Sequence, residues 1–225
     1  MMSVESRSRR TTRLWSSTVG KKIVIALTGA IGVGYLVAHV LGNLLVFEGA
    51  ERINAYATLL KSNTALLWTV RSILIAAVTL HIVAAYQLAR TSQKSRPIGY
   101  KRWRAIASDF ASRTMRWTGP LVGIFIVYHL LHLTTGTVHP DFNERNVYHN
   151  VISGFQVWYV SAIYIVAMLA LSLHLYHGAW SMFQSVGVNS PKYNRLIRLL
   201  ATFLTVVVVG GFISIPVAVL LGLIS

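Results

Sequence analysis

Five long apolar segments alternate with polar, mostly basic stretches along the chain. The segments cover residues of about 22–47, 65–90, 115–136, 157–183 and 195–222. Each is long enough for an α-helix that crosses the hydrocarbon core of a bilayer, which takes about 20 residues. The pattern predicts an all-α integral membrane protein, in which residues 1–225 form a single domain of five transmembrane helices.

The basic residues are distributed unevenly between these helices. The arm of residues 1–20 and the stretches 90–116 and 187–198 are strongly positive, whereas the loops predicted at 48–64 and 137–156 are nearly neutral. The positive-inside rule therefore predicts a cytoplasmic N-terminus and an outside C-terminus. The arm lacks the apolar core and the cleavage site of a signal peptide, so we expect no cleaved leader.

Composition agrees with a membrane protein and excludes several classes of site. Of 225 residues, 54% are hydrophobic and 12% are charged, which is about half the charge content of a soluble domain. The net charge of +15 comes from residues that flank apolar segments, so we do not expect nucleic-acid binding. The absence of cysteine excludes disulfides, thiolate-bound iron–sulfur clusters and covalently attached haem.

Four of the predicted transmembrane helices each carry a histidine within the apolar run. A polar, ionisable residue is costly there and usually binds or moves something. At about 1.5 Å per residue, His39 and His129 share a depth in the outer half of the membrane. His81 and His174 share a depth in the inner half, roughly 10 Å away. Two bis-histidine sites of this kind suit two non-covalent haem b groups, whose six-coordinate iron serves electron transfer.

Other roles for these histidines stay open at this point. A membrane histidine can also bridge two helices by a hydrogen bond. A metal site could use His129 with His132, or His174 with His177, because each pair is spaced three residues apart on one helix face. No carboxylate lies in the later four predicted helices to complete such a site.

The remaining histidines and the tryptophans have more ordinary interpretations. We expect His132 and His177 to face a haem propionate or a neighbouring helix, and His139 and His149 to lie at the surface of the outer loop. Five tryptophans near the expected membrane interfaces are interpreted as interfacial anchors: Trp15, Trp68, Trp117, Trp158 and Trp180.

Several stretches then match one membrane cytochrome family in order along nearly the whole chain. They are SSTVGKKIVIALTG at 16–29, HVLGNL at 39–44, INAYATLL at 53–60, RPIGYKRW at 96–103, SDFASRTMRWTG at 108–119, and His174 followed by Gly178, Trp180 and Ser181. On these motifs the chain resembles the single-chain dihaem cytochrome b subunit (b558 type) that anchors succinate dehydrogenase and fumarate reductase, the respiratory complex II family.

The resemblance implies ligands for both haems. His39, His81, His129 and His174 match the haem ligands of the family. The implied pairs are His39 with His129 and His81 with His174, as the depths also indicate. His177 is a rival ligand, but the interval from His174 to Gly187 favours His174. The first four helices would form the haem-binding bundle, with the fifth alongside.

The resemblance also implies a function and partners. The chain would be the subunit that passes electrons between an iron–sulfur subunit and quinone, while a flavoprotein subunit oxidises succinate in the tricarboxylic acid cycle. It would lie in the bacterial cytoplasmic membrane, with its basic face docking the two soluble subunits, and a higher oligomer of the complex stays open. By analogy the quinone is menaquinone.

Three alternatives remain at this stage. The same anchor serves fumarate reduction, so the direction of the reaction stays open. A dihaem cytochrome b can instead serve a hydrogenase, a formate dehydrogenase or a nitrate reductase. A transporter could use the histidines as proton relays, although the acid-poor helices and the matched histidine depths disfavour it.

The quinone site is the least defined part of the prediction. Trp15, Arg116 and Trp117 are candidates at the cytoplasmic side. Family members with an outer quinone site place an acidic residue near the end of the first helix or the start of the second. Glu48 is the candidate there, with Glu51 beside it.

Overall fold

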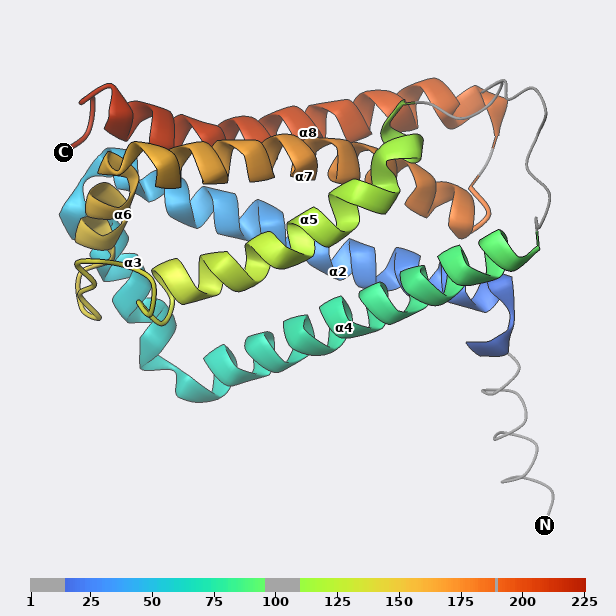
Figure 1. Ribbon diagram of the computed structural model, residues 1–225, viewed down its shortest axis with the longest axis horizontal. Helices are drawn as coiled ribbons and strands as arrows, with labels where there is room; N and C mark the ends of the chain where they lie inside the picture. Colours follow the sequence, from blue (N-terminus) through green and yellow to red (C-terminus); the bar gives the residue numbers. More distant parts are fainter. Residues whose placement is uncertain (1–14, 96–109, 189) are drawn as a thin grey trace, which may run out of the picture.

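The computed structural model describes residues 15–95, 110–188 and 190–225, and within these ranges the chain is helical without any strand (Figure 1). The five long helices are α2 (Thr18–Leu44), α4 (Thr64–Lys94), α5 (Phe110–Leu133), α7 (Trp158–Ser185) and α8 (Pro191–Leu220). The three short ones are η1 (Leu45–Glu48), α3 (Ala50–Ser62) and α6 (Val147–Gln156).

Among the described residues, four helical segments are long and apolar enough to cross a membrane. They are Thr18–Glu48, Thr64–Lys94, Trp158–Ser185 and Pro191–Leu220. This indicates a membrane protein. The fifth predicted span, α5, is less apolar because Arg116, His129 and His132 fall within it, so its crossing of the membrane stays a prediction.

Both predicted outer loops contain a helix, so the prediction of irregular structure there was wrong. Helix α3 begins directly after Gly49, whose φ of +97° turns the chain away from η1. Its end is followed by Asn63, whose side chain accepts a hydrogen bond from the N–H of Leu66 and so starts α4. Asn146 starts α6 in the same way, by accepting from the N–H of His149.

The predicted boundaries of the long helices shift where capping residues lie. Ser17 caps α2 through the N–H of Gly20, so the helix begins earlier than residue 22. Pro191 occupies the first turn of α8, where its missing N–H is tolerated, so this helix begins before residue 195. Helix α5 already includes the described residues from Phe110, ahead of the predicted start near residue 115, so Pro120 lies inside the helix.

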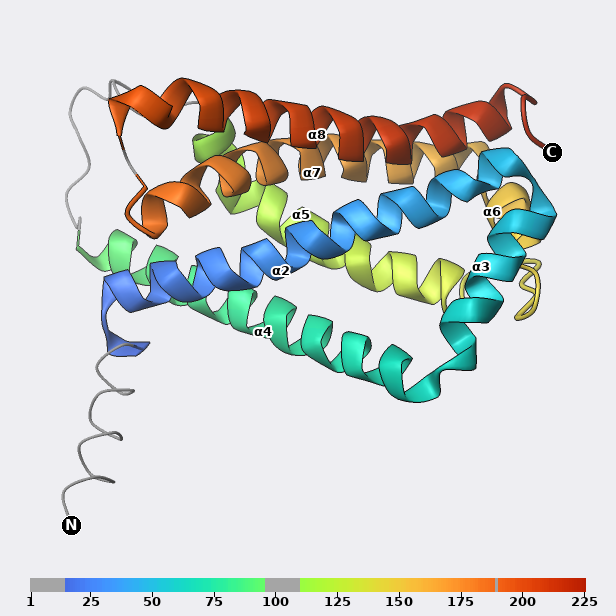
Figure 2. The ribbon, with the colours of Figure 1, turned by 180° about the vertical axis from the view of Figure 1, so that it is seen from behind.

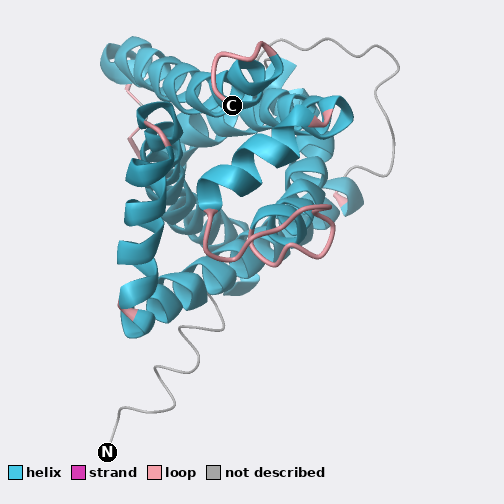
Figure 3. Cartoon of the chain, turned by 90° about the vertical axis from the view of Figure 1, so that its left-hand side faces the viewer, coloured by secondary structure: helices cyan, strands magenta, loops and turns pink. Residues whose placement is uncertain are grey.

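The long helices pack side by side in alternating directions (Figures 1 and 2). Helices α2, α5 and α8 run one way, and α4 and α7 run the other. Helix α2 packs against α4, α7 and α8, and α7 also contacts α5 and α8. The short helices α3 and α6 contact each other and lie with their loops at the end where α2 stops (Figure 3). We name this the capped end, and the opposite end, where α2, α5 and α8 begin, the open end.

Two clusters of buried apolar residues hold the helices together. One lies at the capped end around Phe155, Tyr164 and Val219. The other lies further along α7 and contains Val40 of α2 and Val208 of α8. The outward faces stay apolar as well, and Ile124 on α5 is 73% exposed. An apolar outer surface of this extent suits contact with lipid.

The contact between α2 and α8 depends on a glycine. A Cβ on Gly211 would lie 2.6 Å from Cγ2 of Val40, whose side chain is rigid and buried. We predict that Gly211→Ala lowers stability by about 1–3 kcal/mol through overpacking. Gly210→Ala is the matched control, because its Cβ would meet no atom within 4 Å. Thermal unfolding in detergent measures both, and equal melting temperatures would contradict the proposed close contact.

Candidate histidine-pair sites

The structure brings the four histidines of the predicted spans together in two pairs. The ring centres of His39 on α2 and His129 on α5 are 5.8 Å apart, with ring planes at 81°. Those of His81 on α4 and His174 on α7 are 6.2 Å apart, at 58°. These are the pairs that the depth count predicts. Each pair joins two helices distant in sequence, so the packing of the helices and not local sequence creates the sites.

The separation within each pair suits a metal ion held between two imidazoles. A metal–nitrogen bond of about 2 Å, plus about 1.1 Å from that nitrogen to the ring centre, places two opposed rings about 6 Å apart. Within the described residues, no group of three or more histidine, cysteine or acidic side chains is placed to hold a metal ion alone. Two imidazoles therefore suffice only if another group fills the remaining positions, as a porphyrin does.

The protein holds His81 in the tautomer that metal binding needs. The Oγ1 atom of Thr28 donates its hydrogen to the carbonyl of Val24 at 2.7 Å. It also lies 3.1 Å from Nδ1 of His81, where it is placed to accept the Nδ1–H of that ring, as is the backbone carbonyl of Ile25. The other nitrogen, Nε2, then keeps its lone pair for a metal.

His174 has a glycine neighbour like that of His81 but lacks the hydroxyl contact. Its Nδ1 is buried and has no hydrogen-bond partner within the described part of the chain. A Cβ added at Gly119 of α5 would lie 3.9 Å from this nitrogen. A buried polar atom without a partner is costly and calls for an explanation.

Tyr164 on α7 links the outer pair to a further buried histidine. Its hydroxyl lies 3.3 Å from Nδ1 of His129 and 3.0 Å from Nδ1 of His132. One hydroxyl has a single hydrogen, so it donates to one ring and accepts from the other. His132 is 0% exposed and stacks on Tyr128 with ring centres 5.6 Å apart. His132 therefore faces a neighbouring helix, one of the two placements expected for it.

The expectation that His139 lies at the surface was wrong. This residue is only 7% exposed, and its ring stacks on that of His132 at 4.7 Å. Its Nδ1 accepts the backbone N–H of Asp141, and its Nε2 donates to the carbonyl of Asn150 at 2.9 Å. His149 is partly exposed and pairs with the Asp141 carboxylate at 2.8 Å, in agreement with its expected place.

Gly154 of α6 creates the space for the stacked histidines. A Cβ there would lie 2.8 Å from Cε1 of His132 and 3.0 Å from Nε2 of His139. Because Gly154 has no side chain, α6 can lie against the rings of His132 and His139. Sequence reasoning missed this contact, because it did not predict α6.

The rival ligand His177 lies elsewhere on α7. Its ring contacts Trp180 at 6.0 Å, edge to face, and the guanidinium of Arg198 lies 4.3 Å from the centre of that tryptophan ring. The histidine of α7 whose ring faces His81 is His174.

The structure does not gather the quinone candidates into one site. Trp15, Arg116 and Trp117 lie at the open end, since α2 and α5 both begin there (Figure 2). Glu48 lies at the capped end, where its carboxylate accepts a hydrogen bond from Arg52 at 2.9 Å.

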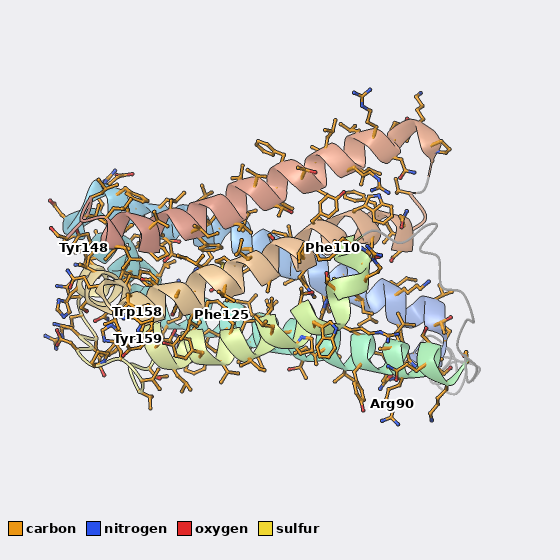
Figure 4. The ribbon with its side chains drawn as sticks, turned by 45° about the horizontal axis from the view of Figure 1, so that its top comes forward. Arg90, Phe110, Phe125, Tyr148, Trp158 and Tyr159 are labelled. Atoms are coloured by element: carbon orange, nitrogen blue, oxygen red, sulfur yellow. The ribbon has the colours of Figure 1, made fainter. Side chains whose placement is uncertain are left out.

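A shallow apolar groove lies between α5 and α7 and includes none of the quinone candidates. Its lining includes Phe125, Tyr128 and Ile163. Figure 4 shows Phe125 on α5, with Trp158 and Tyr159 nearer the capped end at the start of α7. Both of the latter are exposed, which suits the interfacial role expected for Trp158.

Tyr164 offers a direct test of the outer network. We predict that Tyr164→Phe lowers the free energy of unfolding by about 1–3 kcal/mol, because it leaves buried imidazole nitrogens without a partner. Tyr159→Phe is the control, because that tyrosine is exposed on the same helix. The measurement is thermal unfolding in detergent. Identical melting temperatures for the two variants would show that the hydroxyl contacts contribute nothing.

Comparison with known proteins gives no match: no protein-family model, no curated protein and no solved structure is similar to this chain. The likeness to a dihaem cytochrome b therefore depends on the motifs and histidines of the chain itself.

Proposed function

We propose that the chain is the membrane anchor and electron-transfer subunit of a succinate:quinone oxidoreductase, with one haem b held by His39 and His129 and another by His81 and His174. The observation that carries the proposal is the pairing of these four rings at 5.8 Å and 6.2 Å across four helices. The ordered motifs of the cytochrome b558 type support the choice of enzyme.

The residues around each pair support haem binding. Bound haem iron supplies a one-electron carrier at each site. The chain's own part is to hold the imidazoles neutral and correctly turned: Thr28 orients His81, and Tyr164 contacts His129. In this proposal α5 also crosses the bilayer, and α2, α4, α5 and α7 form the haem-binding bundle with α8 alongside.

The charge distribution supports an orientation and a docking face. Basic residues gather at the open end, where α2, α5 and α8 begin and α4 and α7 end: Lys21, Lys22, Arg90, Lys94, Arg113, Arg116, Lys192, Arg195 and Arg198. The positive-inside rule then assigns this end to the cytoplasm of a bacterial cell. The flavoprotein and iron–sulfur subunits would dock there and deliver electrons that pass to menaquinone.

The first test concerns the haem ligands. Protein purified in detergent is expected to carry two haems with a bis-imidazole b-type spectrum. We predict that His174→Ala loses one haem and keeps the other, because His81 then has no opposing imidazole. His177→Ala, changed on the same helix, should keep both. Colourless wild-type protein would contradict the proposal, and loss of haem from His177→Ala alone would reassign the ligand.

The second test concerns the enzyme. We predict that the tagged chain, isolated from its own host in mild detergent, carries a flavoprotein and an iron–sulfur subunit, and that succinate reduces its haems. The control donors are hydrogen and formate. Reduction by one of these and not by succinate would favour the alternative, a dihaem cytochrome b of a hydrogenase or formate dehydrogenase. Comparing succinate oxidation with fumarate reduction in the same complex would establish the direction.

A further inference from the structure

A short sequence element occurs in both helices that carry an outer histidine. In α2, Thr28 and Gly29 precede His39, and in α5, Thr118 and Gly119 precede His129. The interval from glycine to histidine is ten residues in both (29 to 39 and 119 to 129). The same interval puts the two Thr-Gly elements at matching heights below the outer pair.

Each element packs against the inner histidine of the next long helix. A Cβ on Gly29 would lie 3.6 Å from Cε1 and 3.9 Å from Nδ1 of His81. A Cβ on Gly119 would lie 3.7 Å and 3.9 Å from the same two atoms of His174. Helices α2 and α4 therefore form one unit and α5 and α7 a second, with the same local geometry around the inner histidine.

The two units differ in the hydrogen bonds of the inner histidine, since His81 contacts both Thr28 and the backbone of Ile25. The hydroxyl of Thr28, which is 9% exposed, accepts the Nδ1–H of His81. Thr118 is 6% exposed, and its hydroxyl donates to the carbonyl of Thr114 at 3.2 Å. A hydroxyl that donates its hydrogen to a carbonyl still has lone pairs to accept another hydrogen bond. Within the described residues, Nδ1 of His174 is buried without a partner, beside the glycine that follows this threonine.

We propose that Thr28 and Thr118 are a matched pair of positioning residues for the inner haem. With haem bound, the hydroxyl of Thr118 accepts the Nδ1–H of His174, as the hydroxyl of Thr28 is placed to do for His81. Each threonine so directs the Nε2 lone pair of its ligand to the iron. The inference rests on the proposed function, and it concerns residues that do not themselves touch the metal.

The expected effect follows from ligand basicity. A hydrogen bond accepted from the far nitrogen makes an imidazole a stronger donor to a metal. A stronger donor favours ferric over ferrous iron, so removing the hydroxyl should raise the midpoint potential of the inner haem. Thr28→Val and Thr118→Val remove it at nearly constant side-chain volume. A tenfold change in the ferric-to-ferrous binding ratio corresponds to about 59 mV for one electron.

The experiment is a redox titration of both haems in the purified, haem-loaded chain. Each valine variant should raise the midpoint potential of the inner haem by about 59 mV or more, which corresponds to a tenfold change in the ferric-to-ferrous binding ratio. The potential of the outer haem should stay unchanged. Thr28→Ser and Thr118→Ser should restore the original potential, because serine keeps the hydroxyl. Thr202→Val is the matched control: this exposed threonine of α8 also donates to the carbonyl four residues earlier. It should alter neither haem.

Each outcome decides the inference. An unchanged inner potential in both valine variants would overturn it while the proposed function stands. A shift in Thr28→Val alone would overturn the matched role of Thr118. If the valine variants lose the inner haem, recovery of haem in the serine variants supports the inference. Loss of the inner haem in the serine variants too would show that side-chain packing is responsible, and would refute the inference. Wild-type protein without haem would refute the proposed function itself.

Discussion

The constraint on which the rest of the structure depends is that buried imidazole nitrogens must find partners where water is scarce. An α-helix satisfies its own backbone in an apolar setting, but a histidine side chain has two ring nitrogens that the helix does not satisfy. The chain meets part of this need by bringing histidines from different helices close together in pairs and by placing single hydroxyls, from Thr28 and Tyr164, against ring nitrogens. Within the described residues, Nδ1 of His174 and Nε2 of His132 stay without a hydrogen-bond partner.

The requirement for close approach explains where small residues lie. Gly29 and Gly119 let α2 and α5 lie against the inner histidines, and Gly154 lets α6 cover His132 and His139. A Cβ at Gly154 would lie 2.8 Å from His132 and 3.0 Å from His139 and would displace an imidazole, whereas a Cβ at Gly29 or Gly119 would make an ordinary contact with the ring. Gly211 has the same function between two helices, where the side chain opposite is that of Val40.

The two ends of the helical bundle differ in their described residues. At the capped end, Asn54 donates to the side chain of Asn146 at 3.0 Å and accepts the N–H of Tyr148, so α3 and α6 hold each other. The hydroxyl of Tyr148 donates to the backbone carbonyl of Ser225, which ties the last residue to the same cap. Among the described residues, the open end carries basic side chains, such as Lys22, Lys94 and Arg198, and no pair of short helices like α3 and α6.

Sequence alone determined the helical class, the apolar segments and the matched depths of the histidines. These follow from local periodicity and from counting along a helix with a fixed rise. That the histidines of equal depth contact each other is decided by how the helices pack. The fifth span and the haems themselves remain predictions that the histidine geometry supports.

Tertiary structure decided what depends on contacts between distant residues. The burial of His139 follows from the packing of α6, an amphipathic helix of ten residues in a segment that was predicted as part of a loop. The roles of Thr28 and Tyr164 appear only when α4 and α5 bring an imidazole within hydrogen-bond distance. A threonine in an apolar helix commonly bonds to its own backbone, and a tyrosine there has no local partner, so neither residue type reveals from sequence a partner dozens of residues away.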